Sequence, residues 1–428
     1  MKDSNLTRLE EFRQLKKAIR GSEEHLIVGI DVAKEKHYAY FGTATGKSLL
    51  RKLIFDNNRE GFETLLHRAR AIMAQEGLSK VVYGVEPTAD YHKPLGEFLI
   101  NNGQTLVLVS NGAVKQNREL LDGRWDKNDT KDCANAADLI SQGKFLYYDL
   151  PEIETRDLRN LASLKRKLKA QEHSLRMRIR NHLVTQFFPE LDQYYGHREG
   201  ENLAIVKWCL NPSQIAAMEF EKFFQMVTTR NMGEGQRQRL RLIQEAARNS
   251  VACEVGTSIA FEARMLVDHL IQVRKMITET DARIAATCRQ LPGHKSVISI
   301  PGFGPVITAE VMTALGDPQR FTSSKQVLKL AGLDLSASRS GKGSEKVRAK
   351  ISKKGKAALR YALYQSALIA TTRNKYFIEY FSKLIAGRER ERGIKTKMRV
   401  KVAAKMLVIA WTLWKNEEVF QGKYLLQQ

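Results

Sequence analysis

Four acidic side chains in this 428-residue sequence are spaced so that they can meet at one edge of a sheet. Asp31 follows the apolar run LIVGI, and Glu86 ends a second predicted strand. Asp129 and Asp132 stand three residues apart on a predicted helix, so they share one of its faces. Four carboxylates in one place repel one another unless cations bind them, and a hard, oxygen-seeking ion such as Mg²⁺ is the natural occupant.

Such a centre would suit chemistry on a phosphodiester, because two Mg²⁺ ions about 4 Å apart can hold the attacking and the leaving oxygens. Each residue also has an ordinary explanation: Asp31 as a strand-end turn residue, Glu86 as a surface acid and Asp129 as a helix cap. Their joint occurrence in this order favours the catalytic interpretation. Asp138 lies six residues past Asp132, which turns it to another side of the helix.

A second stretch, GTATGKS at 42–48, is close to a phosphate-binding loop but fails as one. Three residues separate its glycines where the loop needs four, and it joins two predicted strands instead of leading from a strand into a helix. A β-hairpin turn is the better interpretation.

The elements that must position the acids alternate between strand and helix from His25 to about Gln142. The pattern predicts strands at 26–32, 38–41, 49–55, 80–85 and 105–110, and helices at 59–75, 91–101 and 129–142. Three strands, a helix, a strand, a helix, a strand and a helix follow in this order. That is the order of the RNase H type of nuclease fold.

Composition indicates a folded protein that binds a polyanion. The formal net charge is +23, and nucleic acid is the commonest partner of such a surface, although a merely soluble basic protein is the plainer alternative. The four cysteines form no Cys-x-x-Cys pair, which argues against a zinc knuckle and fits a reducing cytoplasm. The charged N-terminus does not resemble a signal peptide, and the apolar run 406–414 is too short to span a bilayer.

Two long helical patterns occupy the middle of the chain. Residues 151–189 are helical and basic, with leucines along one side. A cleaner heptad seam alternates steps of four and three along Leu266, Leu270, Val273, Ile277, Thr280, Ile284, Thr287 and Leu291. These helices either pair within one chain or join two chains, and the pattern does not choose. Between them, only helix is predicted for 194–256.

The C-terminal region is basic, helical and rich in glycine. The turn PGFGP at 301–305 leads into a helix of small residues, as in helix-hairpin-helix units, so the backbone N–H groups near Gly302 and Gly304 are candidate phosphate ligands. A tight interhelical turn without a ligand is the alternative. The segment AGLDLSASRSGKGSEKVRAKISKKG is predicted to be a loop, and its Lys353 and Lys354 belong to a basic cluster suited to backbone contacts.

These motifs together resemble the IS-one-ten family of insertion-sequence transposases. The resemblance is carried by GIDVAK, GVEPTADYHKPL, RELLDGRWDKNDTKDCANAADLISQGKF, IPGFGPVITA, AGL, RSG and ISKKG, in this order. It implies that Asp31, Glu86, Asp129 and Asp132 form an Asp-Glu-Asp-Asp tetrad that binds Mg²⁺. Two departures, Ala89-Asp90 after the glutamate and Cys133 after the last aspartate, remove no ligand.

The resemblance also implies a catalytic serine that precedes a glycine, and Ser340 fits best among the serines of its segment. A serine hydroxyl attacks well only after losing its proton or when held near a metal. Arg339 and Lys342 would then neutralise phosphate charge. Further implied partners are target and donor DNA, a structured non-coding bridge RNA, and further copies of the chain as a dimer or tetramer.

We therefore expect an α/β plus all-α protein in four parts: an N-terminal basic helix (1–24), an RNase H-like domain of the Holliday-junction-resolvase type (25–148), a helical coiled-coil section (149–292) and a helical serine-bearing transposase domain (293–428). The expected function is RNA-guided DNA recombination through a phosphoserine intermediate, in a bacterial or archaeal cytoplasm near the nucleoid. A hydrolytic Holliday-junction-type endonuclease and a non-catalytic nucleic-acid scaffold are the alternatives.

Overall fold

The structure is a computed structural model that describes the chain except residues 1–7, 123–128, 195–198, 229–232, 337–349 and 427–428. It divides into two compact units. The first comprises Met1–Pro151 with the short segment Gln319–Thr322, and the second comprises Glu152–Pro318 and Ser323–Gln428. The N-terminal sheet with a helical remainder confirms the predicted α/β plus all-α class. The division into four domains stays a prediction.

The first unit is built on a six-stranded sheet in the order β3-β2-β1-β4-β5-β6. Strand β1 is parallel to β4, and β4 is parallel to β5, whereas β1–β2, β2–β3 and β5–β6 are antiparallel. The strands are β1 (His25–Asp31), β2 (Lys36–Thr43), β3 (Ser48–Asp56), β4 (Lys80–Glu86), β5 (Thr105–Leu108) and β6 (Leu146–Tyr147). All five predicted strands are present, and the short β6 was not predicted.

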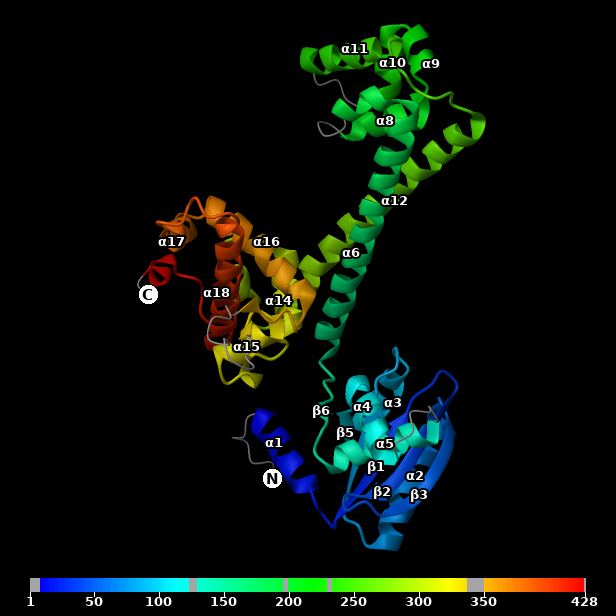
Figure 1. Ribbon diagram of the computed structural model, residues 1–428, viewed down its shortest axis with the longest axis vertical. Helices are drawn as coiled ribbons and strands as arrows, with labels where there is room; N and C mark the ends of the chain where they lie inside the picture. Colours follow the sequence, from blue (N-terminus) through cyan, green and yellow to red (C-terminus); the bar gives the residue numbers. More distant parts are fainter. Residues whose placement is uncertain (1–7, 123–128, 195–198, 229–232, 337–349, 427–428) are drawn as a thin grey trace, which may run out of the picture. The chain divides into compact units, whose positions relative to one another are not determined.

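Helices cover both faces of this sheet (Figure 1). They are α1 (Arg8–Ile19), α2 (Arg59–Glu76), α3 (His92–Asn101), α4 (Asn111–Asp122) and α5 (Asp129–Ser141). Side chains of α2 and α3 pack with Leu26, Val28 and Ile30 of β1, whereas α5 packs with Ile27 on the other face. Because β1 is covered on both sides, its residues are apolar without alternation until Asp31 ends the strand.

The segment that resembles a phosphate-binding loop is a hairpin turn between β2 and β3, as predicted. The backbone N–H of Thr43 donates to the carbonyl of Lys47 at 2.9 Å, and that of Gly46 donates to the carbonyl of Thr43 at 3.1 Å. Gly46 has φ +95°, a conformation that favours glycine.

Two long helices of the second unit, α6 (Ile153–Arg178) and α12 (Thr257–Gln290), run side by side (Figure 1). Ion pairs join Lys165 to Asp281, Glu172 to Arg274 at 3.1 Å, and Arg178 to Glu262 at 2.6 Å. As the residue numbers along α6 increase, those of the ion-pair partners on α12 decrease. The helices are therefore antiparallel, and they pair within one chain. The sequence pattern had left this choice open.

The predicted apolar seam of α12 is buried in its middle and drifts at its ends. Leu270 and Ile284, with the seam positions between them, are buried. Towards the ends the buried positions are Val267 and Cys288, each one residue after the seam positions Leu266 and Thr287. At the C-terminal end the shift has the direction expected of a straight helix, which turns about 20° per heptad away from a 3.5-residue repeat.

The described part of the region between the long helices is mostly helical, as predicted, but residues 249–256 form no helix. It contains the π-helix Ile179–Val184, α7 (Thr185–Phe187), the 3₁₀ helix Pro189–Tyr194, α8 (Glu199–Cys209), α9 (Pro212–Ala217), α10 (Phe220–Val227) and α11 (Glu234–Arg248). Their apolar side chains share one core with α6 and α12.

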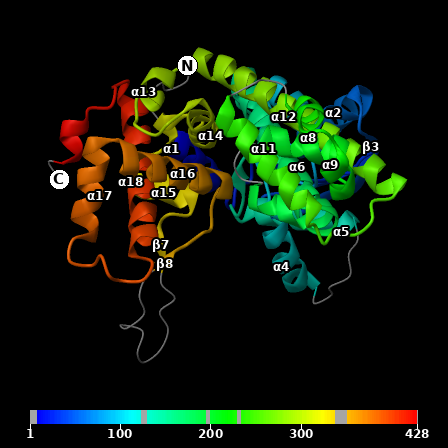
Figure 2. The ribbon, with the colours of Figure 1, turned by 90° about the horizontal axis from the view of Figure 1, so that it is seen from above.

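The C-terminal part contains a helical group in which α16, α17 and α18 pack together (Figure 2). Its helices are α13 (His294–Ile298), α14 (Pro305–Leu315), the 3₁₀ helix Pro318–Arg320, α15 (Ser324–Ala331), α16 (Ala357–Arg373), α17 (Lys375–Ile385), α18 (Ile394–Asn416) and the 3₁₀ helix Gly422–Leu425. Two short antiparallel strands, β7 (Leu335–Ser336) and β8 (Lys350–Ile351), lie in the segment that was predicted to be entirely loop.

Among the described helices, none is both long enough and apolar enough to cross a membrane.

Candidate functional site

Asp31 and Glu86 are neighbours at the C-terminal edge of two parallel strands. Asp31 is the last residue of β1, and Glu86 is the last residue of β4. The register of the two strands pairs Asp31 directly with Glu86. Adjacent strands lie about 4.8 Å apart, so two residues that are distant in the sequence stand side by side.

The pleat of the strands places both acids on the same face of the sheet. Ile27 of β1 and Val82 of β4 pack in one cluster with Ile140 of α5. Successive side chains of a strand point to opposite faces, so residues four positions apart share a face. Asp31 and Glu86 follow Ile27 and Val82 by four positions. Both acids therefore lie on the face that α5 covers.

Two glycines allow α5 to lie unusually close to this face. A Cβ atom at Gly29 would stand 2.1 Å from the carbonyl oxygen of Cys133, and one at Gly84 would stand 2.1 Å from Cδ1 of Ile140. Gly29 and Gly84 are paired in the register of β1 and β4. Together they form a strip without side chains against which the helix packs, and larger residues would push α5 away from the acids.

The close packing of α5 brings the helix turn that contains Asp132 next to the end of β1, where Asp31 lies. It is 3% exposed and directly precedes Cys133, whose Sγ donates a hydrogen bond to the carbonyl of Tyr38 at 3.1 Å. Tyr38 is the partner of Asp31 in the β1–β2 register. The helix segment that carries Asp132 is therefore anchored on the strand residue beside Asp31.

Asp129 is the first residue of α5, one turn before Asp132, and its side chain lies outside the described part of the chain. Within the described part, no group of three or more His, Cys, Asp or Glu side chains gathers closely enough to hold a metal ion. The oxygen-only donors of Asp31, Glu86 and Asp132 nonetheless have the chemistry that Mg²⁺ prefers. Closure of all four acids around metal stays a prediction.

Asp138 has a structural role, in agreement with its exclusion from the predicted tetrad. Its carboxylate accepts hydrogen bonds from Nδ2 of Asn117 on α4 and from Nε2 of Gln142, both at 2.8 Å. Asn117 also donates to Oδ1 of the buried Asn135 at 2.7 Å. These contacts join α4 to α5 and so fix the helix that carries Asp132.

His37 of β2 is a positioning residue that the sequence did not reveal. Its ring is fully buried, stacks on Phe62 with centroids 6.0 Å apart, and accepts at Nδ1 a hydrogen bond from the backbone N–H of Ala33 at 3.1 Å. Burial lowers the pKa of His37. The neutral ring therefore fixes the turn that begins two residues after Asp31. A buried histidine in a strand gives no sequence signal for this contact.

The predicted serine and its two basic neighbours lie outside the described residues, in the segment 337–349 that joins β7 to β8: Ser340, Arg339 and Lys342. The strands on either side pair Leu335 with Ile351 and Ser336 with Lys350. Ser352 hydrogen-bonds Asp334 through its backbone N–H at 2.9 Å and through its hydroxyl. The strands that flank the segment are therefore joined to each other.

Lys353 and Lys354, the predicted contacts to the nucleic-acid backbone, are exposed and are separated from β8 by Ser352. Lys353 has φ +55°, which is uncommon for a residue with a side chain, and its N–H donates to the carbonyl of Gly332 at 3.0 Å. Gly332 itself has no room for a side chain, because its Cβ would lie 2.8 Å from the carbonyl carbon of Lys353. The basic segment is thus held firmly against the end of α15.

The turn between α13 and α14 uses its two glycines differently. Gly302 has φ +88°, and its Cβ would lie 2.7 Å from the carbonyl oxygen of Ser366 on α16, so internal packing accounts for this glycine. Gly304 precedes α14 and would meet nothing within 4 Å. The phosphate-binding role predicted for both glycines stays a prediction.

Comparison with known proteins agrees with these features. A family model described as Transposase, of the DEDD type of IS110, matches residues 28–189, and a second, described as Transposase IS116/IS110/IS902 family, matches residues 294–382. The chain is also 22% identical over 400 residues to the "Insertion element IS116 uncharacterized 44.8 kDa protein" of Streptomyces clavuligerus, across 93% of this chain and 96% of that protein.

The first match contains Asp31, Glu86, Asp129 and Asp132, and the second contains Ser340 with its basic neighbours. Transposases bind DNA and rearrange it, as the basic composition and the paired strand-end acids suggest. The chain belongs to the IS110/IS116 family of insertion-sequence transposases.

Proposed function

We propose that this transposase is an RNA-guided DNA recombinase that cuts and rejoins DNA strands through a phosphoserine intermediate. The observation that carries the proposal is the register pair of Asp31 and Glu86, on the sheet face that α5 covers. Neighbouring carboxylates repel each other, and a divalent cation bound between them would relieve that repulsion.

In this proposal the first unit is an RNase H-like nuclease fold. Support comes from the strand order, with β1, β4 and β5 parallel and β2 antiparallel between β1 and β3. Asp31, Glu86, Asp129 and Asp132 would hold Mg²⁺. When bound, two Mg²⁺ ions supply Lewis-acid stabilisation of the oxygens that enter and leave the phosphate.

Ser340 is the proposed nucleophile. Its Oγ attacks the scissile phosphorus and loses its proton, while the bond from phosphorus to one deoxyribose oxygen breaks and that oxygen leaves as a hydroxyl after taking up a proton. The hydroxyl of a new DNA end then attacks the phosphoserine, which restores the serine and forms the new strand. One phosphodiester is exchanged for another, so no nucleotide cofactor is needed, consistent with the absence of a phosphate-binding loop at 42–48.

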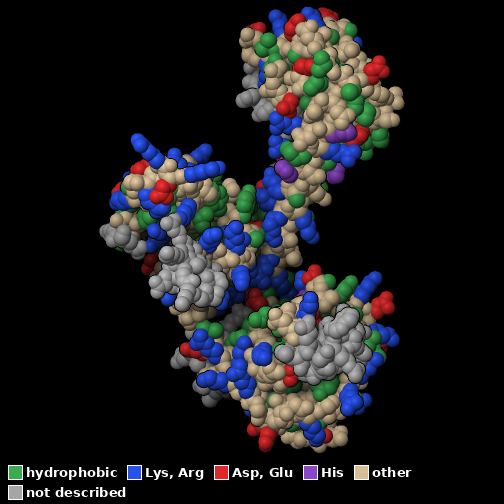
Figure 3. All heavy atoms as spheres, viewed as in Figure 1, with side chains coloured by type: hydrophobic (Ala, Val, Ile, Leu, Met, Phe, Trp, Pro, Cys, Tyr) green, Lys and Arg blue, Asp and Glu red, His purple; other side chains and the backbone are tan. Residues whose placement is uncertain are grey.

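Arg339 and Lys342 would neutralise the charge of the attacked phosphate. The wider basic surface would bind target DNA, donor DNA and a structured bridge RNA, whose base pairing chooses the site. Figure 3 shows Lys and Arg side chains on the exposed face of both units, in line with the net charge of +23. We further propose that recombination needs more than one copy of the chain.

The decisive experiment isolates the full-length protein under denaturing conditions from cells that carry its mobile element, and measures DNA that remains covalently attached. We expect an adduct for the natural protein and none for Ser340→Ala, with Ser344→Ala from the same segment as the matched control. If Ser340→Ala still cleaves strands fully, the protein is a hydrolytic nuclease. If Asp31→Asn and Glu86→Gln both keep full activity in cells, it is a non-catalytic scaffold.

The RNA part of the proposal has its own test. The natural protein is purified from the same cells under native conditions, and the bound RNA is sequenced. A discrete transcript encoded beside the gene supports guidance, whereas a random sample of cellular RNA contradicts it.

A further inference from the structure

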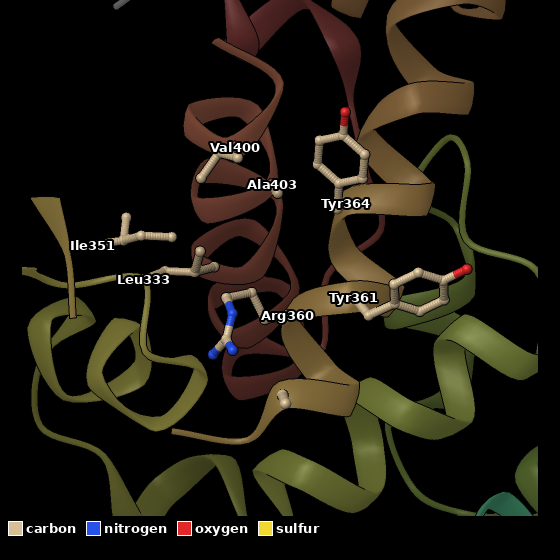
Figure 4. A pocket seen from close by; sticks show the side chains of 8 residues that line it. Leu333, Ile351, Arg360, Tyr361, Tyr364, Val400 and Ala403 are labelled. Carbon is tan, nitrogen blue, oxygen red and sulfur yellow. The ribbon is translucent and has the colours of Figure 1, made fainter. Parts of the chain in front are cut away.

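A cavity of about 300 Å³ lies within the second unit, between strand β8 and helices α16 and α18 (Figure 4). Helix α16 supplies Ala357, Arg360, Tyr361 and Tyr364; the other walls are Val400 and Ala403 of α18, with Leu333 and Ile351. The four α16 residues recur at helical spacing, so they form one face of that helix. The cavity is open to solvent and lies at the low end of the size range of ligand sites, which suits one ring system rather than an extended ligand.

Two tyrosines distinguish this cavity from an ordinary packing defect. Tyr361 is 68% exposed, although an aromatic ring gains most from burial. Tyr364, one turn later on the same face, is partly exposed. Figure 4 shows both rings projecting from α16, with that of Tyr361 directed away from Leu333, Ile351 and Val400. These two solvent-accessible aromatic faces provide surfaces on which a flat, apolar-faced ring can stack.

The surroundings of the cavity are cationic. Arg360 is fixed by a hydrogen bond from its Nη1 to the carbonyl of Ala331 at 2.8 Å. The exposed Lys353 and Lys354 lie between the cavity residue Ile351 and the start of α16. None of the described residues that line the cavity is acidic. A ligand with a flat ring and a negatively charged backbone therefore matches both the walls and the rim.

From these features we infer that the cavity binds a single unstacked nucleobase of a DNA strand, with Tyr361 and Tyr364 as the stacking surfaces and the neighbouring lysines on the strand backbone. The inference rests on the proposed function, because it takes DNA as the partner. Enzymes that act on a base hold it unstacked between side chains, and proteins that bind single strands stack successive bases on aromatic side chains. Strand β8, which contributes Ile351, begins directly after the segment that carries Ser340.

The test compares two fluorescent single strands of about 15 nucleotides, a length within or near the site sizes known for single-strand binding proteins. One is a thymine-only DNA strand, and the other has the same backbone with abasic sites. The full-length natural protein should bind the thymine strand more tightly. Tyr361→Ala should weaken binding of the thymine strand by about 5- to 150-fold, the range known for loss of one base–aromatic stack, and leave the abasic strand unchanged.

Tyr361→Phe keeps the ring and should bind the thymine strand with the natural affinity. Tyr364→Ala should also weaken binding of the thymine strand, and Tyr364→Phe should not. The matched control is Tyr424→Ala, which removes a tyrosine that is 56% exposed and does not line the cavity. Equal losses on both strands, or no loss in Tyr361→Ala, would overturn the base site while leaving DNA recombination standing. A preference for a uracil-only RNA strand over the thymine strand would also overturn it. A natural protein that binds neither strand removes both proposals.

Discussion

Asp31 and Glu86 end two adjacent parallel strands at the same level, and α5 covers the face on which both lie. Each is the last residue of a strand that is otherwise largely apolar. The sheet thus brings two acids together at its C-terminal edge, the usual place for functional groups in a sheet with parallel strands. This relationship leads to the first prediction.

Replacing either acid by its neutral amide should abolish strand exchange without unfolding the protein. Asp31→Asn and Glu86→Gln keep the shape of the side chain and remove the repulsion between neighbouring carboxylates. We expect transposition in cells to fall by about a hundredfold or more, because charge stabilisation at the reacting oxygens is lost. Thermal unfolding, measured in parallel, should still show a cooperative transition of a folded protein.

The control for this prediction is Asp138→Asn. Asp138 is an acid of α5 that accepts a hydrogen bond from Asn117 of α4 and so joins the two helices. It should lower the free energy of unfolding by about 1 kcal/mol and keep transposition. The assignment would be wrong if Asp138→Asn, and not Asp31→Asn, abolished transposition in folded protein.

Gly29→Ala should destabilise the first unit strongly. The new methyl group would stand 2.1 Å from the carbonyl of Cys133, so α5 must move away from the sheet. We expect a loss of about 3 kcal/mol in the free energy of unfolding, measured with urea, since overpacking against backbone is hard to relieve. Gly112→Ala, on α4 with nothing within 4 Å, is the control and should change stability little. Equal effects of the two substitutions would refute the close approach of α5.

The antiparallel α6–α12 pair predicts a large loss of stability at one residue and a small loss at the next. Leu270 is fully buried and Ile271 is 50% exposed. Leu270→Ala should cost about 2–5 kcal/mol through cavity formation, and Ile271→Ala should cost less than about 0.5 kcal/mol. Because the helices pair within one chain, the melting temperature of this unit should not depend on protein concentration. A strong concentration dependence would show that the seam joins two chains.

Acid should destabilise the first unit partly through His37. Burial lowers the pKa of His37, so the unfolded chain takes up a proton that the folded chain does not. The free energy of unfolding should be unaffected above the ordinary histidine pKa of about 6.5 and should fall as the pH drops from there towards the lowered pKa. One such group contributes at most about 1.4 kcal/mol per pH unit.

Denaturation curves at a series of pH values check this prediction. His37→Asn keeps a hydrogen-bond acceptor for Ala33 and should flatten the acid side of the profile. His25 and His92, whose pKa values burial also lowers, account for the slope that remains. An unchanged slope in His37→Asn would show that His37 does not contribute.

The strands and the acids at their ends could be predicted because burial leaves a local record in the sequence. The run LIVGI before Asp31 and the run VVYGV before Glu86 are apolar since both sheet faces are covered. The hairpin at 42–48 was equally clear from its glycines and length. Helix α4 was missed because its sequence, NGAVKQNRELLD, is mostly polar and starts with Asn-Gly, a turn signal.

Other features were hidden because they depend on contacts between distant residues. Gly29 and Gly84 are ordinary glycines in a sequence, and only the approach of Cys133 and Ile140 explains them. The strands β7 and β8 are two residues each, too short for an alternation pattern. The cavity at Tyr361 is formed by residues of α16, α18 and β8, which are distant in the sequence. Sequence patterns therefore identified the acids but not the packing that orients α5 towards them.

The most direct test of the central claim is a crystal structure of the full-length protein with DNA and Mn²⁺, an ion that takes the same oxygen ligands as Mg²⁺ and gives an anomalous signal. The account predicts anomalous peaks between the carboxylates of Asp31 and Glu86, with Asp129 and Asp132 from α5 completing the coordination. Well-ordered carboxylates of Asp31 and Glu86 with no anomalous peak beside them would contradict it.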